Sequence, residues 1–356
     1  MTFGLSKGRA AVALIGVGAA IAAVLIWWQF RTDIMAAGTR IATGSEVIET
    51  PCGPIEYAEA GTGVPLLAVH GSGGGYDQGM AFAAPLTARG IRVIAMSRFG
   101  YLRTPMPVDA SATAQADAFV CLLDALAIPQ AAVMGGSAGA LSALQMAIRH
   151  PERVSALILL VPLAYKPPTE ANSAAPMEPW VENLMMKAIG SDFLFWSGLH
   201  LARGQLMGTV LATPPELLTT ASLSEQARIN AMMDSILPVS ARAAGLRHDT
   251  AASKSLTPAR LDLVQAPTLI ISARDDRYGT YASAEYMAVR IAGARFLGFE
   301  TGGHTWIGHN DDVMNAIAGL LDPAGAVGGP LSGIPCNVTR CCYSLHWPSV
   351  SAGAPS

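Results

Sequence analysis

A run of apolar residues, Ala131–Met134, leads directly into the pentapeptide Gly135–Gly139 (GGSAG), and a helix-forming segment follows at once. This order predicts a buried strand that turns sharply into a helix, with Ser137 at the apex of the turn. We expect glycine at positions 135 and 139 because the strand and the helix approach each other closely there. The alternative interpretation is a glycine-rich surface turn, and the strand and helix on either side argue against it.

Apolar runs without polar alternation recur along the chain, as expected for strands that are covered on both faces of a sheet. Segments with helical periodicity separate them, so the chain alternates between strand and helix. This alternation predicts an α/β fold with a mostly parallel central sheet and helices on both faces. The predicted strands are 47–50, 55–60, 65–69, 92–96, 131–134, 154–161, 267–273 and 294–299, and the predicted helices are 111–126, the segment after 139, 281–291 and 311–321.

Residues 10–28 contain no charged side chain, and Lys7 and Arg9 precede them. A stretch of about twenty apolar residues is long enough to cross a bilayer, so we expect a transmembrane signal anchor here. The positive charges place residues 1–9 in the cytoplasm and the rest of the chain, after a connector at 29–44, outside it. The alternative is a cleaved signal peptide and a secreted protein, although the candidate cleavage site around Met35–Ala37 is a poor match.

The segment 163–256 differs from the rest because proline, methionine, alanine and leucine dominate it and no strand is evident. An insertion of this length predicts a helical cap over the sheet edge that carries Ser137. The flanking segments, 45–162 and 257–322, would form the core domain, and 323–356 would be a disordered tail. Large apolar residues in the cap either line a substrate pocket or, as we prefer, form the cap's own core: Met185, Met186, Phe193, Phe195, Trp196, Met207, Met232 and Met233.

Composition excludes several classes of function. The formal net charge is only −3, so no basic surface for nucleic acid is expected. None of the five cysteines has the spacing of a metal site, and Cys121 lies in a helical pattern that predicts a small buried hydrophobic residue. Histidine, aspartate and glutamate also form no cluster with metal-ligand spacing, so we expect a mechanism without metal or cofactor.

A serine hydroxyl becomes a good nucleophile only when a base accepts its proton and a third group orients that base. Candidates for both roles follow predicted strands, namely Asp275 or Asp276 and, later, His304. The glycine-rich run His70–Gly75 also follows a strand. It could hold a phosphate or supply N–H groups to a developing oxyanion, and it lacks the motifs that a phosphate loop requires.

Taken together, these motifs resemble the α/β-hydrolase superfamily over about residues 55–321. The matching motifs are His70–Gly73, the serine turn, His150–Val154, the acid-bearing strand end and Gly302–His304. The order serine, acid, histidine along the chain is typical of that superfamily. The motifs are specific for the superfamily and carry no information on the substrate.

The resemblance implies a catalytic triad of Ser137 as nucleophile, His304 as general base and acid, and Asp276 as the orienting acid. Asp276 is favoured over Asp275 because the acid of similar proteins follows a small strand-end residue, here Ala273, by three positions. Asp275 would then be a helix-capping or surface carboxylate. The resemblance also implies an oxyanion hole formed by the backbone N–H groups of Ser72 and Ala138, with His70, Gly71, Gly135 and Gly139 in supporting positions.

We therefore predict a serine hydrolase that cleaves a small, apolar ester through an acyl-enzyme. Other chemistry of the superfamily stays open, namely carbon–carbon bond hydrolysis, thioester or amide hydrolysis, and haloperoxidase-like reactions. Two alternatives are a non-catalytic member that binds a small ligand, and a membrane-tethered interaction protein. Neither the substrate nor the oligomeric state follows from the sequence.

Overall fold

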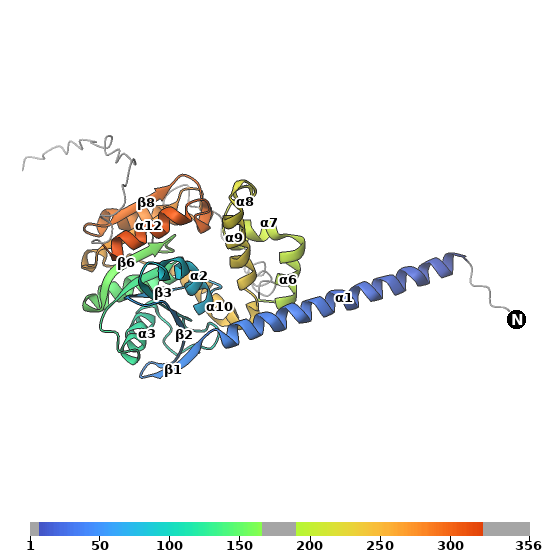
Figure 1. Cartoon of the computed structure of the whole chain (residues 1–356), viewed down its shortest axis with the longest axis horizontal. Coiled ribbons are helices and arrows are strands. Elements are labelled where there is room, and N and C mark those ends of the chain that lie inside the picture. The colour runs from blue at the N-terminus through green and yellow to red at the C-terminus, as the bar shows by residue number, and fades with distance from the viewer. Residues whose placement is uncertain (1–6, 166–189, 323–356) are drawn as a thin grey trace, which may run out of the picture. The chain divides into compact units, whose positions relative to one another are not determined.

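A computed structural model describes residues 7–165 and 190–322 of the chain (Figure 1). It contains an eight-stranded sheet of order β1-β2-β4-β3-β5-β6-β7-β8. The strands from β4 to β8 are parallel, while β1 and β2 form an antiparallel hairpin at one edge. The predicted α/β fold class is confirmed. The strands are β1 Glu46–Thr50, β2 Gly53–Ala60, β3 Val64–Val69, β4 Ile91–Met96, β5 Ala131–Gly136, β6 Val154–Leu160, β7 Thr268–Ala273 and β8 Arg295–Phe299.

Helices cover both faces of this sheet because alternate strand residues point to opposite sides. On one face, Leu67 and Val69 belong to the same apolar cluster as residues of α3 (Ala112–Ala125), α4 (Gly139–Arg149) and α11 (Thr280–Arg290). On the other face, Leu66 and Ala68 pack with α2 (Tyr76–Thr87) and α12 (Asn310–Leu321).

Helix α2 is an element that the sequence analysis did not predict. It begins directly after the glycine run of residues 70–75 and contains Pro85 in its interior. Both features normally disfavour a helix. The helix forms because Ala83 and Leu86 are buried against the sheet, so tertiary packing outweighs local propensity.

The described part of the cap is helical, and its last helix, α10, runs from Ala243 to Ala252. Large apolar side chains, among them Phe195, Trp196 and Met207, are buried in one cluster. Met232 and Met233 are buried in the same cluster, so five of the eight side chains agree with the interpretation that they form the cap's own core. Phe193 does not, because it is 39% exposed and lies against Phe30 and Trp196. Met185 and Met186 lie outside the described residues. The other cap helices are α6 Asp192–Leu201, α7 Arg203–Val210, α8 Pro215–Thr220 and α9 Leu223–Ser235.

Helix α1 spans Lys7–Thr43 without interruption, and its stretch 11–43 is long and apolar enough to cross a membrane (Figure 1). Residues 29–43, predicted as a connector, thus continue the same helix. They do so because this part packs on the cap: Phe30 is buried edge-to-face against Trp196, whose Nε1–H donates to Asp33 at 2.8 Å. The predicted tail, 323–356, lies outside the described residues.

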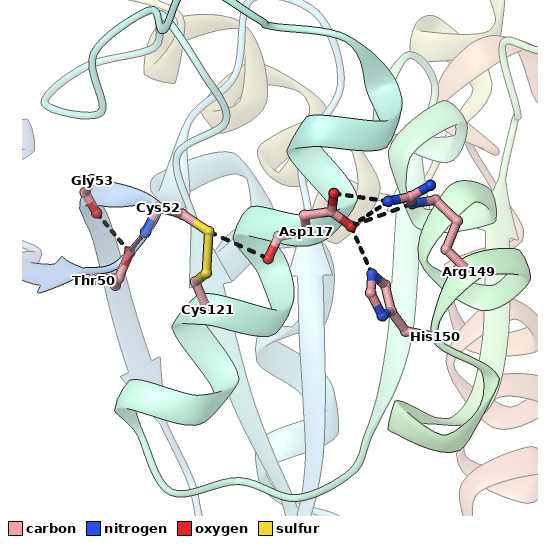
Figure 2. The surroundings of a disulfide bond; sticks show 7 residues. All are labelled: Thr50, Cys52, Gly53, Asp117, Cys121, Arg149 and His150. Carbon is pink, nitrogen blue, oxygen red and sulfur yellow. Dashed lines mark hydrogen bonds and ion pairs between the residues drawn. A yellow bond between two sulfur atoms is a disulfide. The ribbon is translucent and has the colours of Figure 1, made fainter.

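Cys121 is not a free buried thiol, as we predicted, but forms a disulfide with Cys52 (Figure 2). The turn between β1 and β2 carries Cys52, and helix α3 carries Cys121. The two cysteines are 69 residues apart in the sequence. Their proximity depends on the hairpin lying beside α3, and no local pattern reveals that arrangement.

Candidate active site

Ser137 lies in the sharp turn between β5 and α4, with a positive backbone φ of 49°. Such a conformation is strained for a residue with a side chain, and it is held here by hydrogen bonding. The N–H of Ser137 donates to the Leu160 carbonyl at 2.9 Å, and its carbonyl accepts from the N–H of Leu163 at 3.1 Å. Neighbouring segments therefore hold the turn on both sides.

The glycines of this turn are required by close contacts. A Cβ atom on Gly135 would lie 2.7 Å from the Cβ of Ala143 in α4. A Cβ atom on Gly139 would collide with the carbonyl oxygen of His70 and lie 2.9 Å from that of Val69. Strand, helix and glycine loop thus meet at distances that exclude larger residues, as the sequence pattern predicted.

Asp276 and His304 are in direct contact, because the loops after β7 and β8 bring them together. The Nδ1–H of His304 donates to Asp276 Oδ2 at 2.8 Å, and Asp276 is almost fully buried. The same carboxylate accepts from the Thr280 hydroxyl and, at 2.9 Å, from the N–H of Tyr278. Burial acts to raise the pKa of Asp276, but the charge and hydrogen bond of His304, with these further donors, hold that pKa below its usual value.

The adjacent carboxylate, Asp275, has a different function from the surface or helix-capping one that we predicted. It accepts hydrogen bonds from the backbone N–H groups of Gly302 and Gly303, at 3.2 and 2.7 Å. These residues directly precede His304 in the chain. Asp275 therefore holds the histidine-bearing loop, whereas Asp276 holds the histidine ring.

Within the described residues, no hydrogen bond joins the hydroxyl of Ser137 to His304. Both residues nevertheless follow strands of the same parallel sheet at its carboxyl-terminal edge, Ser137 after β5 and His304 after β8, with β6 and β7 between them. The ring of Tyr278 packs edge-on against the imidazole of His304, with centroids 5.0 Å apart. Catalytic hydrogen bonds are often absent in unliganded enzymes and form only when substrate binds.

The glycine loop, which consists of residues 70–75 after β3, lies against the serine turn, residues 135–139. A Cβ atom on Gly71 would be 3.0 Å from the Cβ of Ser137. His70, the first residue of this loop, is fully buried. Its Nε2 accepts from the N–H of Arg98 at 2.9 Å, and its Nδ1–H donates to the Gly71 carbonyl at 2.7 Å. Burial, with the nearby Arg98 charge, lowers the pKa of His70 to about 3, so the ring is neutral and supports the loop.

The predicted oxyanion-hole residues lie on these two segments. Ala138 is the N-cap of α4, and within the described chain no side chain caps that helix. The N–H groups of Ala140 and Leu141 donate to the carbonyls of Ser137 and Ala138, so the N–H groups before them, that of Ala138 included, are the ones that suit an anion. Ser72 is on the glycine loop, and its hydroxyl donates to Asp249 of α10 at 2.9 Å.

The pair formed by Arg98 and Asp249 was not predicted from the sequence. Both side chains are buried, and the guanidinium donates to the two carboxylate oxygens at 2.9 and 2.6 Å. Arg98 is the second residue after β4, and its position near a strand end is only a weak sign of a functional residue. Asp249 lies in a cap helix that contains no recognisable motif. In the described ranges, no group of three or more His, Cys, Asp or Glu residues could hold a metal ion.

A model of the alpha/beta hydrolase fold family matches residues 64–307, which include the serine turn, Asp276 and His304. The chain belongs to this family. A solved alpha/beta hydrolase fold protein from Nakamurella multipartita is 27% identical, with a TM-score of 0.62, and the match covers 78% of this chain and 98% of that one. This α/β-hydrolase is therefore an enzyme of a hydrolase family.

Two curated relatives carry more detailed names. A 2-hydroxymuconate semialdehyde hydrolase of Pseudomonas sp. (strain CF600) is 42% identical over 106 residues, which is 29% of this chain and 38% of that protein. The α/β-hydrolase thus spans less than two fifths of that relative's length. A 2-hydroxy-6-oxo-6-phenylhexa-2,4-dienoate hydrolase of Comamonas testosteroni is 27% identical over 271 residues, covering 74% of this chain and 89% of that protein.

Proposed function

We propose that this α/β-hydrolase uses Ser137 as nucleophile, His304 as general base and acid, and Asp276 as the orienting acid. The observation that carries the proposal is the 2.8 Å hydrogen bond between His304 and a buried Asp276, at the sheet edge where Ser137 sits on a strained turn. A buried acid on Nδ1 leaves Nε2 of the histidine free to accept a proton.

In the proposed mechanism, Ser137 Oγ attacks a carbonyl carbon while Nε2 of His304 takes the hydroxyl proton. The N–H groups of Ser72 and Ala138 bind the negative oxygen of the tetrahedral intermediate. His304 then gives its proton to the leaving group, and the acyl-enzyme forms. Water attacks the acyl-enzyme with His304 as base, and the proton returns to Ser137 when the acid product leaves.

The first candidate for the bond that is cleaved is a carbon–carbon bond next to a ketone. The support comes from the relatives that are named as hydrolases of 2-hydroxymuconate semialdehyde and of 2-hydroxy-6-oxo-6-phenylhexa-2,4-dienoate. These names favour the carbon–carbon alternative over the ester that the sequence analysis placed first. The triad and oxyanion hole serve either bond, since both reactions pass through attack on a carbonyl.

An ester remains the second candidate, because the buried Arg98 beside the glycine loop is already neutralised by a carboxylate. Its guanidinium donates to both carboxylate oxygens of Asp249, at 2.9 and 2.6 Å. A dienoate substrate is an anion and would gain from an unpaired cation, whereas a neutral ester would not.

The test compares the purified wild type with Ser137→Ala on two substrates, 2-hydroxy-6-oxo-6-phenylhexa-2,4-dienoate and p-nitrophenyl butyrate. Covalent labelling by a fluorophosphonate probe is measured in parallel. We expect labelling and turnover that both disappear in Ser137→Ala, with faster turnover of the dienoate. Labelling that survives the loss of Ser137 would refute the nucleophile assignment, and faster ester turnover would reverse the order of the two substrates.

We further propose that the catalytic domain lies outside the cytoplasm, with α1 as its membrane anchor. Lys7 and Arg9 flank the apolar stretch on its N-terminal side, which orients such a helix with its N-terminus in the cytoplasm. The Cys52–Cys121 disulfide supports the same orientation, because disulfides persist in oxidising compartments.

A further inference from the structure

A buried carboxylate from the cap lies beneath the glycine loop and contacts three parts of the core. Asp249 Oδ2 accepts hydrogen bonds from the Ser72 hydroxyl at 2.9 Å and from the Tyr101 hydroxyl at 2.6 Å. Both of its oxygens also accept from the guanidinium of Arg98. Asp249 is only 6% exposed, so a polar network from the cap ends at the loop that carries Ser72.

The partners of Asp249 themselves bind the backbone of the glycine loop. The Tyr101 hydroxyl accepts from the N–H of Gly73 at 3.3 Å, and Arg98 Nε donates to the His70 carbonyl at 2.9 Å. The loop is therefore held before and after Ser72, as well as at Ser72 itself. Each of these contacts leads back to one carboxylate, that of Asp249.

Helix α10, which carries Asp249, is fixed on the core beside this network. The N–H of Leu102 donates to the Ala241 carbonyl at 3.0 Å, and the N–H of Gly245 donates to the Gly100 carbonyl at 2.9 Å. Gly245 also lies flat against the ring of Tyr101, where a Cβ atom would collide with it. This part of the cap is thus seated on the core by backbone bonds that cross the interface.

We propose that Asp249 is a positioning residue, through which the cap helix α10 sets the backbone of Ser72 for oxyanion binding. This inference rests on the proposed function of the site. A carboxylate suits the position because every group that faces it is a donor: the Arg98 guanidinium and the hydroxyls of Tyr101 and Ser72. An asparagine of the same shape would present its own N–H group to these donors, so the loop would lose its orientation.

The reaction with a fluorophosphonate probe tests oxyanion positioning directly. Ser137 Oγ forms a bond to phosphorus, fluoride leaves, and the hydroxyl proton goes to His304, while the phosphoryl oxygen occupies the oxyanion hole. The maximal inactivation rate therefore reports on the hole, and the half-saturating probe concentration reports on binding. The melting temperatures of all variants are measured as well. The inactivation rates are then compared at a temperature at which every variant is folded.

We expect Asp249→Asn to lower the maximal inactivation rate by about 10- to 100-fold, less than the loss of a whole oxyanion donor, with half-saturation changed by less than about threefold. Ser72→Ala, which keeps the N–H but loses the hydroxyl, should lower the rate by about 3- to 10-fold. The double variant should be no more than about twofold slower than Asp249→Asn, because both changes act through the same contact.

Glu56→Gln is the matched control, since Glu56 is a fully buried carboxylate whose side-chain partners in the described chain, Ser45, Ser97 and Arg103, lie outside the glycine loop. Glu56→Gln should change the maximal inactivation rate by less than about twofold, even if it lowers the melting temperature. This difference from Asp249→Asn is what a role of Asp249 in oxyanion positioning requires. A loss of rate in Glu56→Gln equal to that in Asp249→Asn would assign Asp249 a purely structural role and overturn the inference.

Two other results also overturn it: a wild-type rate in folded Asp249→Asn, or a double variant whose loss is the full product of the two single losses. Should Asp249→Asn fail to fold, Ser72→Ala and Tyr101→Phe leave the Arg98–Asp249 pair intact, and wild-type rates in both would refute the inference. If the wild type shows no labelling or turnover that depends on Ser137, the proposed function itself has failed.

Discussion

Two adjacent carboxylates, Asp275 and Asp276, hold different parts of the candidate site. Asp276 contacts the imidazole of His304, and Asp275 contacts the backbone N–H groups of Gly302 and Gly303. Removing the first should leave the histidine without its orienting acid, and removing the second should only loosen the loop. The two residues are therefore a matched pair for testing the triad.

Asp276→Asn should lower kcat by about 10³- to 10⁴-fold, because an amide at this position favours the wrong histidine tautomer. Asp275→Asn should cost at most about 10²-fold, through displacement of the histidine loop. Steady-state kinetics on the better substrate of the wild type measures both. A larger loss at Asp275 than at Asp276 would contradict the assignment of the acid.

His70 should make the protein less stable as the pH falls. Its folded pKa is about 3, below the ordinary value of 6.5, so between these values the unfolded chain binds a proton that the folded chain does not. The stabilising contribution is complete above pH 6.5 and decreases toward pH 3, by about 1.4 kcal/mol for each pH unit.

The measurement is urea unfolding of the wild type and His70→Gln between pH 3.5 and 7, roughly the window in which a histidine titrates. The free energy of unfolding should fall less steeply with decreasing pH in the variant, which has no group to protonate at this position. Curves that stay parallel over the whole range would mean that His70 is already accessible to protons in the folded state.

At the scale of elements, helix α10 depends on a glycine for its contact with the core. Gly245 is inside the helix, and Tyr101 occupies the space that its side chain would need. Gly319 is a matched control, because it is also inside a helix, α12, and a Cβ atom there would meet nothing within 4 Å in the described structure.

Gly245→Ala should reduce the free energy of unfolding by about 1–3 kcal/mol, since Tyr101 must move to make room. Gly319→Ala should instead be neutral or stabilising by up to about 1 kcal/mol, through helix propensity alone. Chemical denaturation of the two variants gives both values. Stabilisation by Gly245→Ala would show that α10 can move away from Tyr101 without penalty.

At the scale of the whole molecule, α1 has two parts with different environments. The apolar side chains of residues 12–28 are exposed in the isolated chain, whereas Phe30 is buried on the cap. Arg40 forms an ion pair of 2.6 Å with Asp77 and donates to the Leu237 carbonyl. The helix therefore continues from a candidate membrane segment into the folded domain.

Removing residues 1–28 should release the protein from the membrane fraction and leave its melting temperature nearly unchanged. In that shortened chain, Phe30→Ala should lower the melting temperature by about 5–15 °C, because it leaves a cavity against Trp196. Thr39→Ala, at an exposed position of the same helix, is the control. Equal melting temperatures for the two variants would show that α1 does not pack on the cap.

The sequence by itself determined the α/β fold, because strands buried on both faces appear as apolar runs that alternate with helical patterns. The glycines at 135 and 139 form a local motif that is recognised without the structure. It also identified Ser137, Asp275 or Asp276, and His304 as candidates, since each lies in a loop or turn after a predicted strand, and the resemblance to the superfamily selected Asp276. Only the tertiary structure decided the disulfide of Cys121, the role of Asp275 and the network of Asp249. These contacts join segments that are far apart in the chain, so their energy depends on the packing of whole elements and on no local pattern.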